Sequence, residues 1–156
     1  MTPISICIIA KNEEKHIDTF LSSIHKHMKN YPHEIIFVDT GSTDATKKLA
    51  SKYTDRIFDF VWVNDFSAAR NFSLSKATYD WVLILDCDEY ITQLDPLGLI
   101  QFMEQFPEEI GVITIQNHYP MNGQDSIYTA QLERFFNRKL FHYESIIHEQ
   151  VVSSTN

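Results

Sequence analysis

Short apolar runs alternate with helical patterns along the first two thirds of this 156-residue chain, and this alternation constrains the fold more than any other feature. Four runs have the character of buried strands, at residues 4–9, 34–38, 56–63 and 81–85. Strands that alternate with helices form a mainly parallel sheet covered by helices on both faces. We therefore expect an α/β fold, with the most hydrophobic run, 81–85, at the centre of the sheet.

The segments between these runs have the features of helices. One face of the first is apolar, with Ile17, Phe20, Leu21, Ile24 and Met28 at helical spacing. We expect Asn12 to cap this helix and Ser67 to cap a later, shorter one. Asp95 followed by Pro96 predicts a further helix that runs to about residue 105.

The pattern changes after this last helix. Residues 110–115, 127–136 and 146–152 are strand-like, and Asn122 and Gly123 form a typical turn between two of them. We therefore expect an antiparallel or mixed edge at the C-terminal side of the sheet. No repeat or linker interrupts the sequence, so residues 1–156 are predicted to form one domain.

Composition excludes several classes of function. The chain has 13 basic and 21 acidic residues, a formal charge of −8, which makes nucleic acid an unfavourable partner. Two cysteines, Cys7 and Cys87, cannot build a disulfide framework and suit the reducing cytosol. The apolar runs are far shorter than the roughly 20 residues that span a bilayer. We therefore expect a soluble, cytoplasmic chain without a transmembrane segment.

The most informative polar residues are Asp86 and Asp88, which directly follow the run 81–85. Residues two apart in an extended chain project to the same side, and open α/β sheets bind ligands at the carboxyl ends of their strands. Hard carboxylate oxygens in such a cleft suit Mg²⁺ or Mn²⁺. The alternative, that these aspartates only cap a turn, stays open at this stage.

Two further polar loops follow predicted strands, at residues 10–14 and 39–44. If the sheet is parallel, both lie at the same edge as Asp86. An acidic side chain there can accept hydrogen bonds from a nucleobase or from ribose hydroxyls, and a helix that begins after Ser42 offers free backbone amides. Taken singly, each loop could equally be a capping turn.

These loops also carry a resemblance. The successive segments IIAKNEE (8–14), VDTGSTD (38–44), NDFSAARN (64–71) and LDCDE (85–89) resemble the signatures of family 2 glycosyltransferases in order and spacing. RFFN (134–137) and IHEQ (147–150) are similar to later motifs of a bacterial branch. The resemblance implies the glycosyltransferase A (Rossmann-like) fold, a three-layer sandwich. It also implies a nucleotide-diphospho-sugar donor, a divalent metal, Mg²⁺ or Mn²⁺, and transfer with inversion at the anomeric carbon.

The resemblance further implies roles for individual residues on the donor side. It places Ala10, Glu13 and Asp39 against the nucleoside, with Asp44 nearby. It also places Arg70 near the base or the diphosphate. These roles agree with the hydrogen-bonding capacity of the loops that carry the residues.

A second group is implied for the metal and the diphosphate. Asp86 would face the ribose or the metal, Asp88 would ligate the metal, and His148 would complete the metal or diphosphate contacts. Cys87 departs from the family pattern, in which a small residue such as alanine is usual. We expect this change to be tolerated because the side chain between two aspartates points away from the metal.

Inversion by a single displacement requires a general base near the acceptor hydroxyl. Our candidate is Glu149, in the last motif, with Glu89 as the second choice. The competing interpretation of Glu149 is a structural ion pair with Arg134 or Arg138.

Several questions stay open from the sequence. Family catalytic domains usually continue past residue 156, so we expect part of the acceptor side to lie outside this chain. The acceptor, a saccharide, lipid or protein, the oligomeric state and a peripheral association with the inner face of the membrane are undetermined. A sugar nucleotidyltransferase is an alternative, although its first loop is glycine-rich and basic whereas 11–14 is acidic. The second alternative is a non-catalytic domain that binds a nucleotide sugar.

Overall fold

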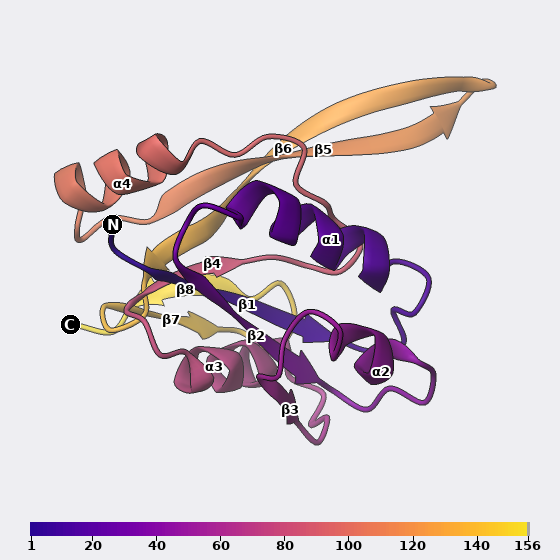
Figure 1. Cartoon of the computed structure of the whole chain (residues 1–156), viewed down its shortest axis with the longest axis horizontal. Coiled ribbons are helices and arrows are strands. Elements are labelled where there is room, and N and C mark those ends of the chain that lie inside the picture. The colour runs from indigo at the N-terminus through magenta and orange to yellow at the C-terminus, as the bar shows by residue number, and fades with distance from the viewer. Residues whose placement is uncertain (156) are drawn as a thin grey trace.

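The computed structural model describes residues 1–155, which form a six-stranded sheet with helices on both faces (Figure 1). The strand order is β3-β2-β1-β4-β6-β5. In that order the strands are β3 (Ile57–Asp59), β2 (His33–Asp39), β1 (Ile4–Ala10), β4 (Trp81–Ile84), β6 (Gln124–Asn137) and β5 (Gly111–Met121). The first four are parallel, and β6 and β5 are antiparallel to their neighbours. This confirms the predicted sheet, its antiparallel edge and the central place of β4.

Each face of the sheet has its own apolar core. On one face lie α1 (Ile17–Met28), α2 (Thr46–Ala50) and α4 (Pro96–Gln105), and the predicted apolar stripe of α1 is fully buried there. The other face is covered by α3 (Phe66–Lys76) and by the two-stranded ribbon of β7 (Phe141–Glu144) and β8 (Gln150–Ser153). The central strands β2, β1 and β4 are therefore covered on both faces, and their carboxyl ends stay open to solvent.

Two predicted helix caps are wrong. Asn12 does not cap α1, because the helix begins at Ile17 and Asn12 has a φ of +53° in the loop before it. Ser67 does not cap α3; Asp65 does, through a hydrogen bond that its side chain accepts from the backbone N–H of Ala68. Both errors place the cap within a polar stretch where several side chains could serve.

Two elements also differ from the prediction in length, and one strand was not predicted. The strand expected over 56–63 is only the three residues of β3, because the chain turns away from the sheet after Asp59. The apolar positions Ala45, Leu49, Ala50 and Tyr53 predict a helix that reaches Tyr53, but α2 has five residues and stops at Ala50. Strand β7 was not predicted, and it pairs with β8 in a sheet of its own. Short elements depend on tertiary contacts that local patterns do not contain.

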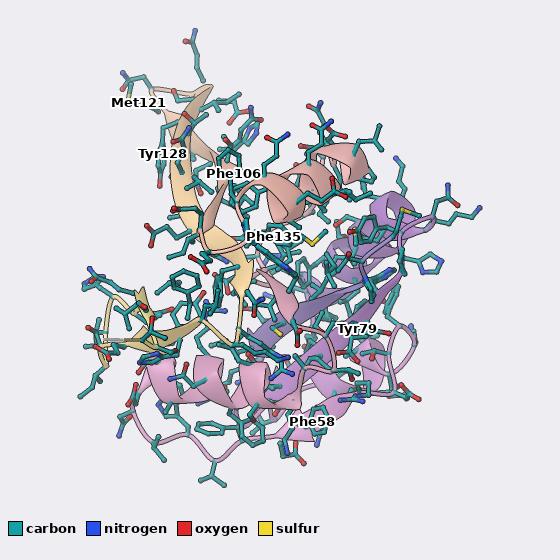
Figure 2. The ribbon with its side chains drawn as sticks, turned by 90° about the vertical axis from the view of Figure 1, so that its left-hand side faces the viewer. Phe58, Tyr79, Phe106, Met121, Tyr128 and Phe135 are labelled. Carbon is teal, nitrogen blue, oxygen red and sulfur yellow. The ribbon has the colours of Figure 1, made fainter. Side chains whose placement is uncertain are left out.

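The β5–β6 hairpin projects beyond the rest of the molecule, with Met121 and Tyr128 on its outer part and Phe135 near its base (Figure 2). Its turn is the predicted pair Asn122 and Gly123, with φ of +53° and +75°, as a tight turn compatible with strand twist requires. Among residues 1–155, no helix is long and apolar enough to cross a membrane.

Candidate functional site

A cleft of about 690 Å³ lies at the carboxyl ends of the parallel strands, within the usual size of small-molecule sites. Its walls come from the ends of β1 and β4, from the loop before α3 and α3 itself, and from the β7–β8 loop. The lining residues are Ile9, Ala10, Lys11, Glu13, Thr40, Trp62, Phe66, Arg70, Asp86, Cys87, Asp88, Ile147, His148 and Glu149. The structure thus brings together seven of the nine predicted site residues.

The loop after β1 and the loop after β2 are hydrogen-bonded to each other. The backbone N–H of Asn12 donates to Ser42 Oγ at 2.9 Å, and Asn12 Oδ1 accepts from the N–H of Thr43 at 2.8 Å. The N–H of Glu13 donates to Thr46 Oγ1 at 2.8 Å. These bonds join the loop after β1 to the segment that leads into α2, so they fix one wall of the cleft.

Asp39 and Asp44, the other two predicted site residues, are not among the cleft-lining residues. Asp39 is buried, and its Oδ1 accepts from the N–H groups of Gly41 and Ser42, at 2.9 and 2.8 Å. Its Oδ2 is buried without a partner among the described residues. Asp44 accepts from the hydroxyl and N–H of Thr46, which lowers its pKa. Asp44 therefore shapes the loop, whereas Asp39 keeps an acceptor beside the cleft residue Ala10, its partner across the strands.

Arg70 is the buried cation of the cleft, with a side chain only 7% exposed. It projects from the middle of α3. Its Nη2 donates to Asp86 Oδ1 at 2.7 Å, and its Nε donates to Glu149 Oε1 at 3.4 Å. Nη1 is buried with no partner in the part of the chain that the structure describes. A buried, unpaired guanidinium N–H is costly, so a ligand oxygen at this point would stabilise it.

Asp86 is held by two arginines. Arg70 contacts Oδ1, and Arg134 Nη2 donates to Oδ2 at 3.0 Å. Burial alone would raise the pKa of this carboxyl, but the two guanidinium charges outweigh burial, and the pKa lies below its usual range. Asp86 is therefore ionised at neutral pH and strongly oriented.

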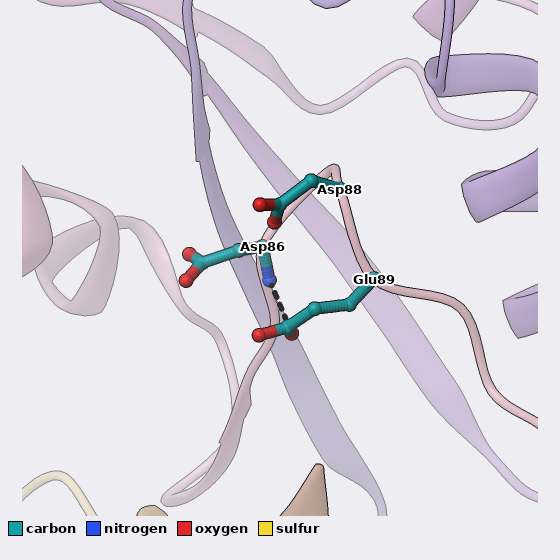
Figure 3. A group of neighbouring side chains, drawn as sticks. All are labelled: Asp86, Asp88 and Glu89. Atoms are coloured by element: carbon teal, nitrogen blue, oxygen red, sulfur yellow. Dashed lines mark hydrogen bonds between the residues drawn. The ribbon is translucent and has the colours of Figure 1, made fainter. Parts of the chain in front are cut away.

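Three carboxylates gather on the loop after β4, as Figure 3 shows. One oxygen each of Asp86, Asp88 and Glu89 lie within 4.8 Å of one another. Glu89 turns back toward the loop and accepts from the N–H of Asp86 at 3.0 Å, and burial raises its pKa. Asp88 is exposed and has no hydrogen-bond partner among residues 1–155. Mg²⁺ and Mn²⁺ prefer carboxylate oxygens as ligands, and here three carboxylates lie close together, one of them, Asp88, without a hydrogen-bond partner among residues 1–155.

Glu13 approaches this group from the first loop. Burial raises its pKa, and the negative charges of Asp88, Asp44 and Asp86 add to that effect, while His16 opposes it. A cation bound at the carboxylates would relieve the repulsion among these side chains.

The β7–β8 loop brings His148 and Glu149 into the cleft. Ser145 and His148 have φ of +80° and +56°, an uncommon conformation for residues other than glycine. The carbonyl of Ile146 accepts from the N–H of Phe66 at 3.1 Å, which anchors the loop on α3. His148 lines the cleft but is not in the carboxylate group, whose third member is Glu89.

The expected structural partners of Glu149 are wrong. Glu149 pairs with Arg70, whereas Arg134 binds Asp86 and Glu89. Arg138 donates to the carbonyl of Tyr79 at 2.8 Å, among the elements at the other end of β4. Sequence distance gave no means of choosing among three arginines. The structure also adds cleft residues to which the sequence assigned no role, Lys11 and Thr40, and Trp62, whose strand spacing had favoured a place in the core.

Cys87 behaves as predicted. Its side chain is buried in the core between the sheet and α1, away from the flanking carboxylates. Burial raises the pKa of the thiol, and the nearby charges of Glu13, Asp86 and Asp88 add to the shift. A neutral, unreactive thiol at this position is consistent with a packing role.

Comparison with known proteins points to one family. The family model for glycosyl transferase family 2 matches residues 5–152. A TPR repeat-containing protein of Synechococcus elongatus is 32% identical over 155 residues, which are 99% of this chain and 36% of that protein. An uncharacterized glycosyltransferase of Rickettsia typhi is 36% identical over 93 residues, 60% of this chain and 30% of that protein. The chain thus spans 36% or less of the length of these relatives.

Solved structures agree with the fold. S. aureus TarS matches with a TM-score of 0.59 at 25% identity, over 70% of this chain and 21% of that chain. TarS 1-349 in complex with UDP matches with a TM-score of 0.58 at 24% identity, over 80% of this chain and 37% of that chain. These likenesses confirm the expected glycosyltransferase A fold.

Proposed function

This chain belongs to glycosyl transferase family 2, and we propose that it moves a sugar from a nucleotide-diphospho-sugar donor to an acceptor with inversion at the anomeric carbon. One observation carries the proposal. The cleft at the carboxyl ends of β1 and β4 gathers Arg70 from α3, Asp86 and Asp88 from the loop after β4, and Glu149 from the β7–β8 loop, three separate segments of the chain. Glycosyl transfer needs this combination of a buried cation, free carboxylates and a candidate base in one site.

We assign the nucleoside to the wall formed by the first two loops. The unpartnered Oδ2 of Asp39 supports this, because it can accept a hydrogen bond from a nucleobase N–H or a ribose hydroxyl. Ala10 offers little steric hindrance at the end of β1, and Glu13 stands beside it. Asp44 acts indirectly, through the loop that it shapes.

The diphosphate is assigned to Arg70. Its buried Nη1 has no protein partner among the described residues, and a phosphate oxygen is the acceptor that a guanidinium binds best. Arg70 would hold the leaving diphosphate next to the carboxylates that keep the arginine in place.

A divalent cation, Mg²⁺ or Mn²⁺, would be held by Asp88 and Asp86, with Glu89 beside them and His148 as a further ligand from the β7–β8 loop. Asp88 supports this assignment most directly because its carboxylate is exposed and unpaired in the described chain. When bound, the cation supplies stabilisation of the negative charge that develops on the leaving diphosphate. A cation also compensates the repulsion among the clustered carboxylates.

Glu149 is the proposed general base. It would take the proton of the acceptor hydroxyl while that oxygen bonds to the anomeric carbon and the bond from this carbon to the diphosphate oxygen breaks. The electron pair leaves with the diphosphate. Support comes from the position of Glu149 in the cleft, on a different segment from the carboxylates, with Arg70 as its one charged partner among the described residues.

A donor screen tests the proposal. The protein is melted with UDP, GDP and dTDP sugars, each with Mn²⁺ and with chelator, and a ligand at 100 times its Kd stabilises a protein by roughly 2.7 kcal/mol. UDP sugars are the first choice, since TarS 1-349, which shares the fold, forms a complex with UDP. Donors that stabilise the protein are then assayed for release of the nucleoside diphosphate.

The outcomes separate the competing functions. Release of a nucleoside diphosphate supports glycosyl transfer, whereas pyrophosphate release from a nucleoside triphosphate and a sugar phosphate would indicate a nucleotidyltransferase. Binding without turnover, in the full-length protein and with candidate acceptors, would indicate a non-catalytic nucleotide-sugar-binding domain. Absence of stabilisation by every donor would contradict the proposal.

A further inference from the structure

We propose that Arg134 is a positioning residue, which holds Asp86 and Glu89 in the geometry that the metal and the donor require. The inference rests on the proposed function. Arg134 lies on β6, outside the loops that form the cleft, and it is not one of the residues that line the cleft. Its effect on a ligand would therefore pass through the carboxylates that it binds.

The backbone around Arg134 is specialised to aim this side chain. Val112 of β5 pairs with Glu133, but the next pair joins Gly111 to Phe135, so Arg134 is the extra residue of a β-bulge. A bulge interrupts the alternation of side chains along a strand and redirects one of them. Phe135 packs into the core on the face of α1 and α4, whereas the guanidinium of Arg134 reaches the carboxyl end of β4.

Gly111 makes room for this bulge. A Cβ at Gly111 would lie 3.1 Å from both the Cβ and the carbonyl oxygen of Phe135, closer than such atoms normally approach. A larger residue would force β6 away at the position next to Arg134. The close approach of the two strands and the bulge are therefore parts of the same local arrangement.

The guanidinium of Arg134 is shared among three acceptors on one loop. Nη1 donates to the carbonyl of Ile84 at 3.2 Å, and Nη2 donates to Asp86 Oδ2 at 3.0 Å and to Glu89 Oε1 at 3.3 Å. The side chain is only 11% exposed. A planar guanidinium can serve the backbone and two carboxylates at once, which a lysine ammonium on a flexible chain does much less well.

These contacts divide the roles of the three carboxylates. Arg134 occupies Asp86 Oδ2 and Glu89 Oε1, and Arg70 occupies Asp86 Oδ1, whereas the carboxylate of Asp88 has no partner among the described residues. Without Arg134, Asp86 and Glu89 would repel each other and Asp88 within a few ångströms. Partners of this kind typically change metal affinity by roughly 10 to 100-fold when removed.

Two substitutions distinguish positioning from simple charge. If Arg134 contributes only a positive charge, Arg134→Met makes the site more negative and strengthens Mn²⁺ binding, and Arg134→Lys leaves it unchanged. If Arg134 positions the carboxylates, both variants weaken Mn²⁺ binding, and Arg134→Met weakens it by about tenfold or more. The matched control is Arg138→Met, which removes a hydrogen bond to the carbonyl of Tyr79 away from the cleft.

The experiment is titration calorimetry of UDP, or of GDP if the wild-type protein prefers it, in Mn²⁺ and in chelator. Thermal melting without ligand checks that each variant is folded, and Arg134→Lys carries the test if Arg134→Met does not fold. If Arg134→Lys binds the nucleotide in Mn²⁺ with wild-type affinity, or if Arg134→Met binds it more tightly, the inference about Arg134 is wrong and the proposed function is unaffected. Absence of nucleotide binding by the wild-type protein instead overturns the proposed function, and the inference with it.

Discussion

Arg70 Nη2 lies 2.7 Å from Asp86 Oδ1, and this ion pair joins the middle of α3 to the loop after β4. The same guanidinium also reaches Glu149, on a third segment. Burial disfavours a charged arginine, but the adjacent negative charges, led by that of Asp86, outweigh burial, and the pKa of Arg70 is raised. One permanently charged side chain therefore links the loop after β4 to the β7–β8 loop.

Arg70→Lys should weaken nucleoside diphosphate binding by about tenfold or more, since a hydrogen bond to a charged group contributes roughly 1.5–3 kcal/mol. The lysine keeps the charge but cannot serve Asp86, Glu149 and a phosphate from one planar group. Calorimetric titration measures the change. Arg56→Lys is the control, because Arg56 donates to the carbonyl of Lys76 at the other end of the sheet. Equal losses in both variants would contradict a role in donor binding.

Asp88→Ala should abolish the part of nucleotide binding that depends on Mn²⁺, because the cation loses its one free carboxylate ligand. The melting temperature should hardly change, since Asp88 has no hydrogen-bond partner in the described chain. Titration with and without chelator measures the effect, with the exposed Asp55→Ala as control. If Asp88→Ala retains the wild-type difference between the two conditions, the proposed metal site is wrong.

Much of this architecture could be predicted because local sequence patterns determine it. The alternation of apolar runs with helical faces placed Ile4, Trp81 and the stripe of α1 in the core, where they are buried. Parallel strands end at one edge, so the loops that follow Ala10 and β4 had to meet. The cleft follows from the parallel direction of these strands, which the alternation of strands with helices predicts.

The parts that escaped prediction depend on contacts between distant segments. Nothing near Arg134 in the sequence indicates a β-bulge, which exists only in the register of β6 against β5. Glu89 joins the carboxylates because its side chain folds back to the N–H of Asp86. The ion pair between Arg70 and Glu149 joins residues 79 positions apart. Only the packing of α3 against the β7–β8 ribbon creates that pair.

Glu34→Gln should lower the free energy of unfolding by about 2 kcal/mol at pH 7, the scale of hydrogen bonds to a charged group. Glu34 accepts from the hydroxyl of Ser5 and from the N–H and hydroxyl of Thr78, bonds that join β2 to β1 and to the loop before β4. Burial would raise the pKa of Glu34, but these bonds and Arg56 lower it overall.

The sign of the pH dependence follows from that shift. A folded-state pKa below the unfolded value, about 4.3, gives stability that is present above the unfolded pKa and is lost as the pH falls through the folded pKa. The free energy of unfolding of the wild-type protein and of Glu34→Gln should be measured in urea from pH 7 to pH 3. The difference between the two should therefore become smaller toward pH 3. A difference that stays constant over this range would show that ionised Glu34 is not its source.

Glu149→Gln tests the assignment of the base. If Glu149 takes the proton of the acceptor hydroxyl, turnover should fall by roughly 10²–10⁴-fold, the usual contribution of a general base. Donor affinity should change little, because the glutamine carbonyl can still accept from Nε of Arg70, which lies 3.4 Å from Glu149 Oε1. The measurements are kcat and donor KM in the full-length protein with the acceptor found by screening.

The division between kcat and KM decides which role Glu149 has. A loss confined to donor binding would make Glu149 a partner that orients Arg70, and Arg70→Lys should then reproduce it. Unchanged turnover would exclude Glu149 and direct attention to Glu89, whose pKa is raised by burial and which Arg134 contacts at 3.3 Å. Glu89→Gln is therefore the matched variant, and a fall in turnover in Glu149→Gln alone, with the donor KM preserved in both, identifies Glu149 as the base.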